Sequence, residues 1–140
     1  MAVEKNDGMF SGYLNPYIPI DQVLKNNYFY TGDIALYDHD KVFYIKGRAK
    51  NVILIAGTKV FPEEVEAAIN DHEAVSESYV YAEKHSIFGA TISADIVLKK
   101  SLPEETLRHS LKEKLPPNHW PHQIRFVDHI TKTNTGKIKR

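Results

Sequence analysis

The second half of the chain places hydrophobic residues at helical spacing in two stretches. In the first stretch, the apolar positions are three and four residues apart, at Val65, Ala68 and Ile69. Pro62 precedes them and suits the first turn of a helix, where its missing N–H group is not needed. The glutamates that follow favour the positive end of the helix dipole. This pattern predicts a helix that begins at about Pro62 and buries one face.

Leucines that recur every four residues predict a second helix. They are Leu107, Leu111 and Leu115. Ser101 lies three residues before Glu104, which is the spacing of a capping box, and therefore marks the expected start of this helix. Pro116-Pro117 cannot continue a helix and marks its expected end.

Short runs of β-branched and aromatic residues predict strands. These runs are residues 34–37, 42–45, 52–55, 74–83, 90–98 and 124–127. The first two flank a polar stretch and form a predicted hairpin, followed by a break at Lys46-Gly47. The third run ends at a turn around Gly57. Residues up to about 27 are rich in Gly, Pro, Asn and Tyr without periodicity, which indicates an irregular arm.

Strands and helices joined by short links favour an α+β fold. We expect a small antiparallel or mixed three-stranded sheet covered by two helices and preceded by the β-hairpin and the irregular arm. Burying one Leu, Ile or Val contributes about 1.5–3 kcal/mol, so the apolar helix faces and strands can hold this unit together. The arm has no such face and needs a partner surface to become ordered.

The composition argues against several classes of partner. Eighteen Lys and Arg residues balance eighteen Asp and Glu residues, so no net field draws the chain to nucleic acid or anionic lipid. Cysteine is absent, which excludes disulfides, thiolate metal sites and cysteine nucleophiles. The seven histidines lack metal-ligand spacing, so no metal site is expected. Neither a membrane-length apolar run nor a signal peptide is evident, and a cytoplasmic location is expected.

Three motifs in a fixed order carry the candidate chemistry. The first is Tyr30-Thr31-Gly32-Asp33, the second runs from Gly47 to Glu66, and the third is the stretch from Thr131 to Arg140. The two acceptor oxygens of Asp33 suit the two hydroxyls of a ribose. In the third motif, Lys137 follows a glycine and places a compact charge on a long stem, which suits an anionic site. Taken singly, such residues are more often a turn-forming aspartate and a solvated lysine.

Together, the three motifs resemble the C-terminal signature of the adenylate-forming enzymes. This superfamily comprises the acyl- and aryl-CoA synthetases, the adenylation domains of nonribosomal peptide synthetases, and the luciferases. The resemblance covers nearly the whole chain and is strongest to an acyl-CoA synthetase. It implies that residues 1–46 are the end of the large N-terminal domain and that residues 47–140 are the small C-terminal AMP-binding-enzyme domain.

The resemblance also implies a role for each motif residue. Lys137 would bridge the acyl carboxylate and the α-phosphate of ATP during adenylation. Asp33 and Arg48 would contact the nucleotide at its ribose or phosphate. Lys50 falls at the hinge about which the C-terminal domain rotates before thioester formation. Gly57 lies in the loop that leaves room for the pantetheine arm of CoA, and the positive φ of a hairpin glycine is a second reason for its presence.

The chain departs from the family pattern at two places. Thr131 stands where the family often has proline, which should loosen the approach to the lysine loop. Asn118-His119 stand where it often has Tyr-Lys, a change that affects contacts with the acceptor or with the large domain.

The phosphate loop, the adenine pocket and the acyl pocket of the family lie upstream of the matching region. We therefore expect the chain to be a piece of a much larger ligase and not to catalyse the full reaction alone. The partners implied are the large N-terminal domain, ATP (with AMP as product), a carboxylic acid and CoA. Mg²⁺ would be held by the phosphates and the large domain.

Two alternatives stay open. The acyl group could pass to a carrier protein, although the absence of a carrier domain or a phosphopantetheine serine motif after Arg140 favours CoA slightly. The chain could also be a non-catalytic, stand-alone binding module. Retention of Asp33, Arg48 and Lys137 argues against that alternative, because a purely structural descendant has no need for all three. An arm without its partner surface could also associate with a second copy.

Overall fold

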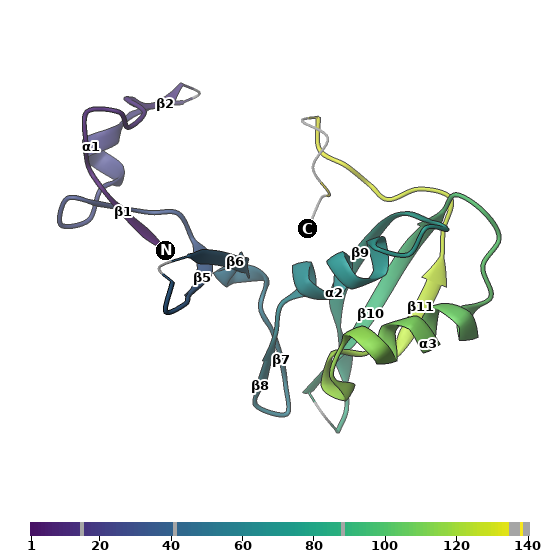
Figure 1. Cartoon of the computed structure of the whole chain (residues 1–140). Helices are drawn as coiled ribbons and strands as arrows, with labels where there is room; N and C mark the ends of the chain where they lie inside the picture. The colour runs from purple at the N-terminus through teal and green to yellow at the C-terminus, as the bar shows by residue number, and fades with distance from the viewer. Residues whose placement is uncertain (15, 41, 88, 135–137, 139–140) are drawn as a thin grey trace. The chain divides into compact units, whose positions relative to one another are not determined.

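The computed structural model describes residues 1–14, 16–40, 42–87, 89–134 and 138. By its internal contacts, the chain divides into two compact units, residues 1–50 and 51–140. Both units are traced along the chain in Figure 1.

The beginning of the first unit contains short elements that the sequence pattern did not predict. Strand β1 (Ala2–Glu4) pairs with β4 (Tyr28–Tyr30), and β2 (Gly12–Leu14) pairs with β3 (Tyr17–Pro19), both antiparallel. Helix α1 (Ile20–Val23) follows β3. The strands have three residues each, which is too short to show an alternating pattern. The predicted irregular arm is therefore a succession of short paired segments.

The predicted hairpin of the first unit is confirmed. Strand β5 (Asp33–Tyr37) pairs antiparallel with β6 (Phe43–Arg48). In the turn, the side chain of Asp38 accepts hydrogen bonds from the backbone amides of Asp40 and Val42, each at 2.9 Å. An aspartate that satisfies the backbone in this way is typical of a tight turn.

The second unit begins with another hairpin. The short helix η1 (Ala49–Asn51) spans the division between the units, and β7 (Ile53–Ile55) pairs antiparallel with β8 (Thr58–Val60). The two turn residues, Ala56 and Gly57, have φ angles of 46° and 86°. Positive φ at both positions is the geometry of a type I′ turn, which matches the twist of paired strands.

A mixed three-stranded sheet forms the centre of the second unit, as predicted. Strand β10 (Gly89–Leu98) lies between β9 (Val75–His85), to which it is antiparallel, and β11 (Gln123–Phe126), to which it is parallel. A parallel pair needs a long crossover connection. Here that connection contains helix α3 (Glu104–Lys114) and the short helix η2 (Pro117–His119).

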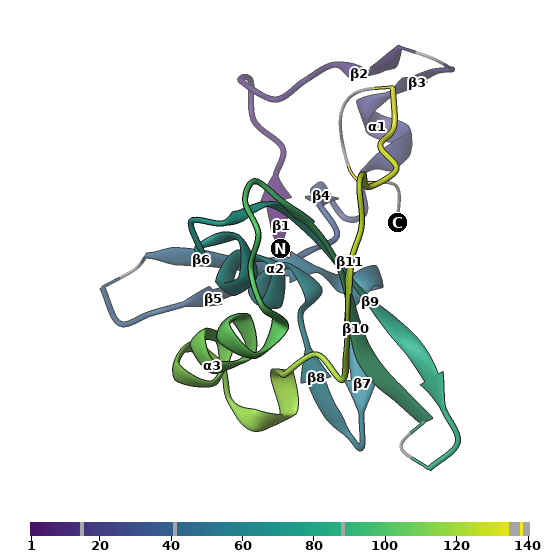
Figure 2. The same ribbon diagram turned by 90° about the vertical axis from the view of Figure 1, so that its right-hand side faces the viewer.

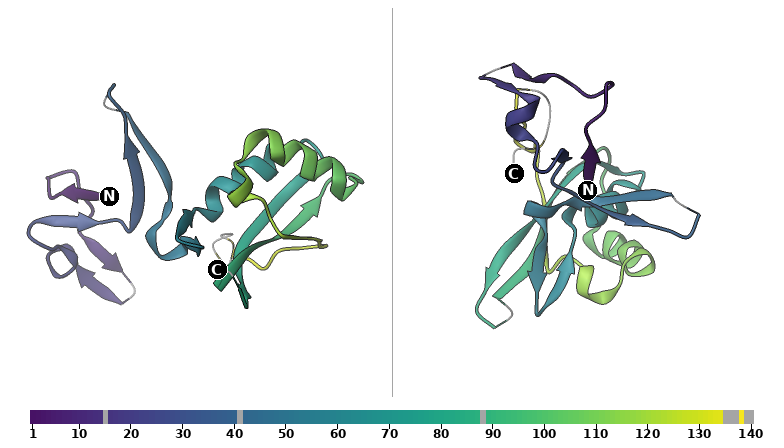
Figure 3. Two further views of the ribbon diagram at one scale, coloured as in Figure 1. Left: turned by 90° about the horizontal axis from the view of Figure 1, so that it is seen from below. Right: turned by 90° about the vertical axis from the view of Figure 1, so that its left-hand side faces the viewer.

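Two helices cover one side of the sheet, as Figures 2 and 3 show for α2 (Pro62–Asn70) and α3. The core between helices and sheet consists of fully buried aliphatic side chains. They include Val65 and Ile69 of α2, Leu107 and Leu111 of α3, and Val80, Ile92 and Ile96 of the sheet. These positions include most of those that the helical spacing of the sequence predicts to be buried. The α+β fold is thus confirmed.

The predicted capping box at the start of α3 is wrong. The residue before the helix is Pro103, which makes no side-chain cap hydrogen bond, and the helix begins at Glu104. A proline disfavours helical geometry at the residue before it, here Leu102. Because the helix cannot extend back through Leu102, Ser101 cannot serve as its N-cap. The predicted end is confirmed, since α3 stops at Lys114, just before the two prolines.

Helix α2 is also hydrogen-bonded to the sheet. The carboxylate of Glu66, buried at 8% exposure, accepts a hydrogen bond of 2.8 Å from the backbone amide of Val80 in β9. One turn later, Asn70 Oδ1 accepts a hydrogen bond of 2.9 Å from the hydroxyl of Ser78. These bonds satisfy polar groups that would be costly to bury without partners.

Candidate functional site

Asp33 and Arg48, predicted separately as nucleotide-binding residues, lie opposite each other on β5 and β6. Arg48 Nε is 3.0 Å from Asp33 Oδ1. A second guanidinium nitrogen of Arg48 donates to the backbone carbonyl of Thr31 at 2.8 Å. The aspartate side chain is the more buried of the two, at 21% exposure against 52% for the arginine. The side chain of Asp33 is therefore mostly covered, whereas that of Arg48 is open to solvent.

A bulge in β6 brings these two residues together. Near the turn Ala35 faces Ile45, but Ile34 faces Gly47, so Lys46 is one extra residue. If Lys46 were paired in regular register with Ile34, Asp33 would face Gly47, and Arg48 would point to the other side of the hairpin. Gly47 is buried and has a φ of 153°, which L side chains rarely adopt. The predicted break at Lys46-Gly47 is therefore a bulge within the strand.

The arrangement of Asp33 and Arg48 suits a ligand that has hydroxyl groups beside a negative charge. A carboxylate accepts hydrogen bonds from hydroxyls, and a guanidinium donates to phosphate oxygens. Pairing with Arg48 also orders the carboxylate before any ligand arrives. The geometry is compatible with a ribose and its phosphate.

Two of the other predicted site residues lie on elements of their own. Lys50 is exposed and lies in η1, at the division between the two units. Gly57 lies at the tip of the β7–β8 hairpin, where an added Cβ atom would meet nothing within 4 Å. A substitution at Gly57 would therefore strain the backbone without a steric clash. Lys137 lies outside the described residues.

The segment that leads to the lysine motif makes contacts that the sequence analysis missed. Ile130 is buried, and Lys132 Nζ lies 2.5 Å from Glu77 Oε2 on β9. Lys132 also forms an antiparallel β-bridge with Ile138. Because Lys132 belongs to the third motif, the sequence marks it as a candidate functional residue. No spacing rule predicts its contact with Glu77.

A polar network links the three strands of the sheet. Arg125 of β11 donates to Asp95 of β10 at 2.8 Å and to the hydroxyl of Tyr81 on β9. The hydrogen bond to Asp95 raises the pKa of the Arg125 guanidinium. Burial raises the pKa of the Tyr81 hydroxyl, and the charge of Asp95 adds to this effect. Because these groups partner one another, the network serves to hold the strands together.

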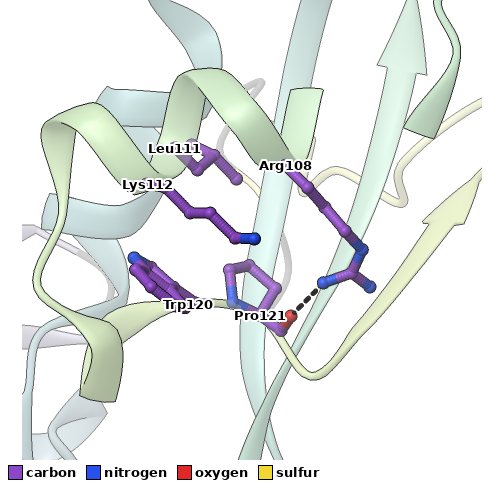
Figure 4. A pocket seen from close by; sticks show the side chains of 5 residues that line it. All are labelled: Arg108, Leu111, Lys112, Trp120 and Pro121. Atoms are coloured by element: carbon purple, nitrogen blue, oxygen red, sulfur yellow. Dashed lines mark hydrogen bonds between the residues drawn. The ribbon is translucent and has the colours of Figure 1, made fainter. Parts of the chain in front are cut away.

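A small hollow on α3 is shown in Figure 4 and is lined by Arg108, Leu111, Lys112, Trp120 and Pro121. Its volume of about 30 Å³ has room for water but not for a nucleotide or an acyl chain. Arg108 donates to the backbone carbonyl of Pro121 at 2.8 Å, and the indole of Trp120 donates to that of Leu115 at the same distance. These contacts attach the loop after α3 to the helix.

The described ranges show no group of three or more His, Asp or Glu side chains that could hold a metal ion. Among the same residues, no helix is long and apolar enough to cross a bilayer.

Residues 64–137 match the AMP-binding enzyme C-terminal domain family. The chain belongs to this family. The match ends at Lys137, the predicted catalytic lysine, whereas Asp33, Arg48, Lys50 and Gly57 precede it.

Curated relatives extend the similarity of this AMP-binding enzyme C-terminal domain to nearly the whole chain. The 4-hydroxybutyrate–CoA ligase 1 of Metallosphaera sedula is 37% identical over 138 residues, which cover 95% of the chain and 24% of the ligase. The long-chain-fatty-acid–CoA ligase of Bacillus subtilis is 34% identical over 140 residues, or 99% of the chain and 25% of the ligase. The chain thus spans about a quarter of the length of these relatives.

Solved structures agree with the family assignment. The o-succinylbenzoate CoA synthetase of Bacillus subtilis, in complex with its acyl-adenylate intermediate, superimposes with a TM-score of 0.80 at 25% identity, covering 84% of the chain and 24% of the synthetase. The amide bond synthetase of Marinactinospora thermotolerans gives a TM-score of 0.76 at 26% identity, covering 91% of the chain and 27% of that protein. The AMP-binding enzyme C-terminal domain therefore has the fold of adenylate-forming ligases.

Proposed function

We propose that this chain is the C-terminal part of an ATP-dependent acyl-CoA synthetase, an AMP-forming acid–thiol ligase. The observation that carries the proposal is the similarity to CoA ligases over 95% or more of the chain. The ordered Asp33–Arg48 pair supports it, because its chemistry suits a ribose beside a phosphate.

In the first half-reaction, a carboxylate oxygen of the acid attacks the α-phosphorus of ATP, and the bond to pyrophosphate breaks. Negative charge builds on the phosphoryl oxygens, and the ammonium of Lys137 offsets it while attracting the carboxylate. Asp33 accepts hydrogen bonds from the ribose hydroxyls, and Arg48 donates to the phosphate. Mg²⁺, held by the phosphates and the large domain, would supply further positive charge.

In the second half-reaction, the C-terminal domain turns about Lys50 and presents the β7–β8 hairpin to the acyl-adenylate. The thiol of CoA attacks the acyl carbonyl carbon, loses its proton, and displaces AMP. The small tip of the hairpin, Ala56-Gly57, leaves room for the narrow pantetheine arm. The exposed position of Lys50, at the division between the two units, supports its role as the hinge.

The first unit is proposed to complete the large domain of the ligase. Its hairpin has large apolar side chains that are each more than half exposed, namely Leu36, Tyr37, Phe43, Tyr44 and Ile45. Exposed apolar side chains gathered on one small element mark a surface that another part of a protein covers. The upstream three quarters of the ligase are the proposed cover.

The proposal is tested with a chimera in which this chain replaces the final quarter of the Metallosphaera sedula ligase. We expect acid-dependent exchange between ATP and pyrophosphate, followed by CoA thioester formation. We expect neither reaction from the 140-residue chain alone, nor from the large domain alone. A chimera that folds and binds ATP but shows no exchange would contradict the proposal.

Replacement of Lys50 by proline tests the hinge. Proline fixes φ and should restrict the rotation, so we expect ATP–pyrophosphate exchange to persist while thioester formation falls at least about tenfold. Lys50→Ala removes the same side chain without fixing the backbone and should leave both rates within about twofold. Equal loss of both reactions in Lys50→Pro would exclude the hinge role.

A further inference from the structure

We propose that Glu77 and Lys132 are positioning residues, which fix the start of the stretch that leads to Lys137. This inference rests on the proposed function, in which Lys137 acts during adenylation. Neither Glu77 nor Lys132 needs to contact a substrate in this role. They act by positioning Lys137.

Lys132 holds the base of this segment in two ways. Its backbone pairs with that of Ile138, six residues further along the chain. Its ammonium lies 2.5 Å from the carboxylate of Glu77 on β9. Lys132 is therefore paired with a residue beyond Lys137 and is also tied to β9, the longest strand of the sheet.

Two further contacts guide the chain from β11 to this point. The amide of Val127 donates to the carbonyl of Ile96 at 2.9 Å, and Ile130 is buried. At Thr131, the chain lacks the fixed φ that a proline would supply. The backbone before Lys132 is therefore freer to rotate than it would be with proline at position 131. The Lys132–Glu77 ion pair supplies a restraint from a side chain instead.

The exposure of the pair decides between a stabilising and a positioning role. The side chains of Lys132 and Glu77 are 43% and 27% exposed. Ion pairs in such surroundings contribute little to folding stability, because water already solvates both charges well. Orientation matters more, since a misplaced catalytic group reduces the rate strongly even when the fold is intact.

The test uses the chimera with Glu77→Gln, Lys132→Met, and the exchanged pair Glu77→Lys with Lys132→Glu. Each single variant is expected to lower kcat of ATP–pyrophosphate exchange by about three- to fivefold, the loss that corresponds to an exposed ion pair, with KM for ATP unchanged. Thioester formation from supplied acyl-adenylate should keep its rate, because Lys137 acts only in the first half-reaction. The exchanged pair should recover most of kcat.

The chain provides a matched control. Lys100 Nζ lies 2.5 Å from Glu73 Oε1, in an ion pair of the same chemistry at another place in the same unit. Glu73→Gln and Lys100→Met should leave both half-reactions unchanged. Thermal unfolding of all variants should show equal midpoints.

Unchanged exchange in Glu77→Gln and Lys132→Met would overturn this inference. Equal loss of both half-reactions, or a lowered unfolding midpoint, would also overturn it, because either result indicates a structural role. The proposed function is judged separately. It fails if Lys137→Ala keeps the exchange activity, whereas loss in Lys137→Ala with normal Glu77 variants refutes only the positioning role.

Discussion

Replacement of Lys137 by alanine in the chimera is expected to reduce acid-dependent ATP–pyrophosphate exchange by about 10²- to 10³-fold. This is the usual cost of removing one group that stabilises charge in a transition state. The loss should appear in kcat, because the ammonium binds the developing charge more strongly than the ground state. Initial rates of exchange at saturating ATP and acid measure the effect.

Lys139 provides the control for this experiment. It lies two residues after Lys137 in the same basic motif, so Lys139→Ala removes an equal charge from the same stretch. We expect its exchange rate to stay within about threefold of the parent, since a charge that acts only at long range is screened at physiological ionic strength. Similar losses in both variants would show that the motif supplies a diffuse positive field and not a catalytic lysine.

The second large effect concerns stability. Ile69 of α2 is fully buried among the helices and the sheet, at 0% exposure. Ile69→Ala should lower the free energy of unfolding by about 2–5 kcal/mol, because it removes buried methyl groups and leaves a cavity. Urea denaturation of the 140-residue chain, followed by circular dichroism, measures this change.

Ile87→Ala is the matched control, since Ile87 is 79% exposed at the end of the β9–β10 hairpin. Its effect should stay within about 0.5 kcal/mol. If the two variants unfold at the same urea concentration, the core described for the second unit is incorrect.

The sequence predicted the elements whose signals are local. Pro62 and the apolar positions after it indicated α2 correctly, because proline placement and helical spacing both act within a few residues. The predicted start of α3 was wrong, and the reason is also local. Pro103 excludes Leu102 from the helix, and this restriction outweighs the capping-box spacing of Ser101.

The candidate site could be predicted only as separate residues. Asp33 and Arg48 were both identified, but their pairing depends on the register shift at the β6 bulge. The break predicted at Lys46-Gly47 marked its position without indicating the register. The contact of Lys132 with Glu77 joins residues that are far apart in the chain and needed the folded sheet to bring them together. The roles of Lys137, Lys50 and Gly57 stay predictions.

The hydrogen bond of the buried Glu66 affects self-association of this domain. A strand at the edge of a sheet offers free amides on which another molecule can add a strand, which is a common route to aggregation. In β9, the amide of Val80 is already occupied by the Glu66 carboxylate, and α2 stands beside that edge. Sheet extension at Val80 is therefore blocked, which disfavours pairing of two copies through this part of β9.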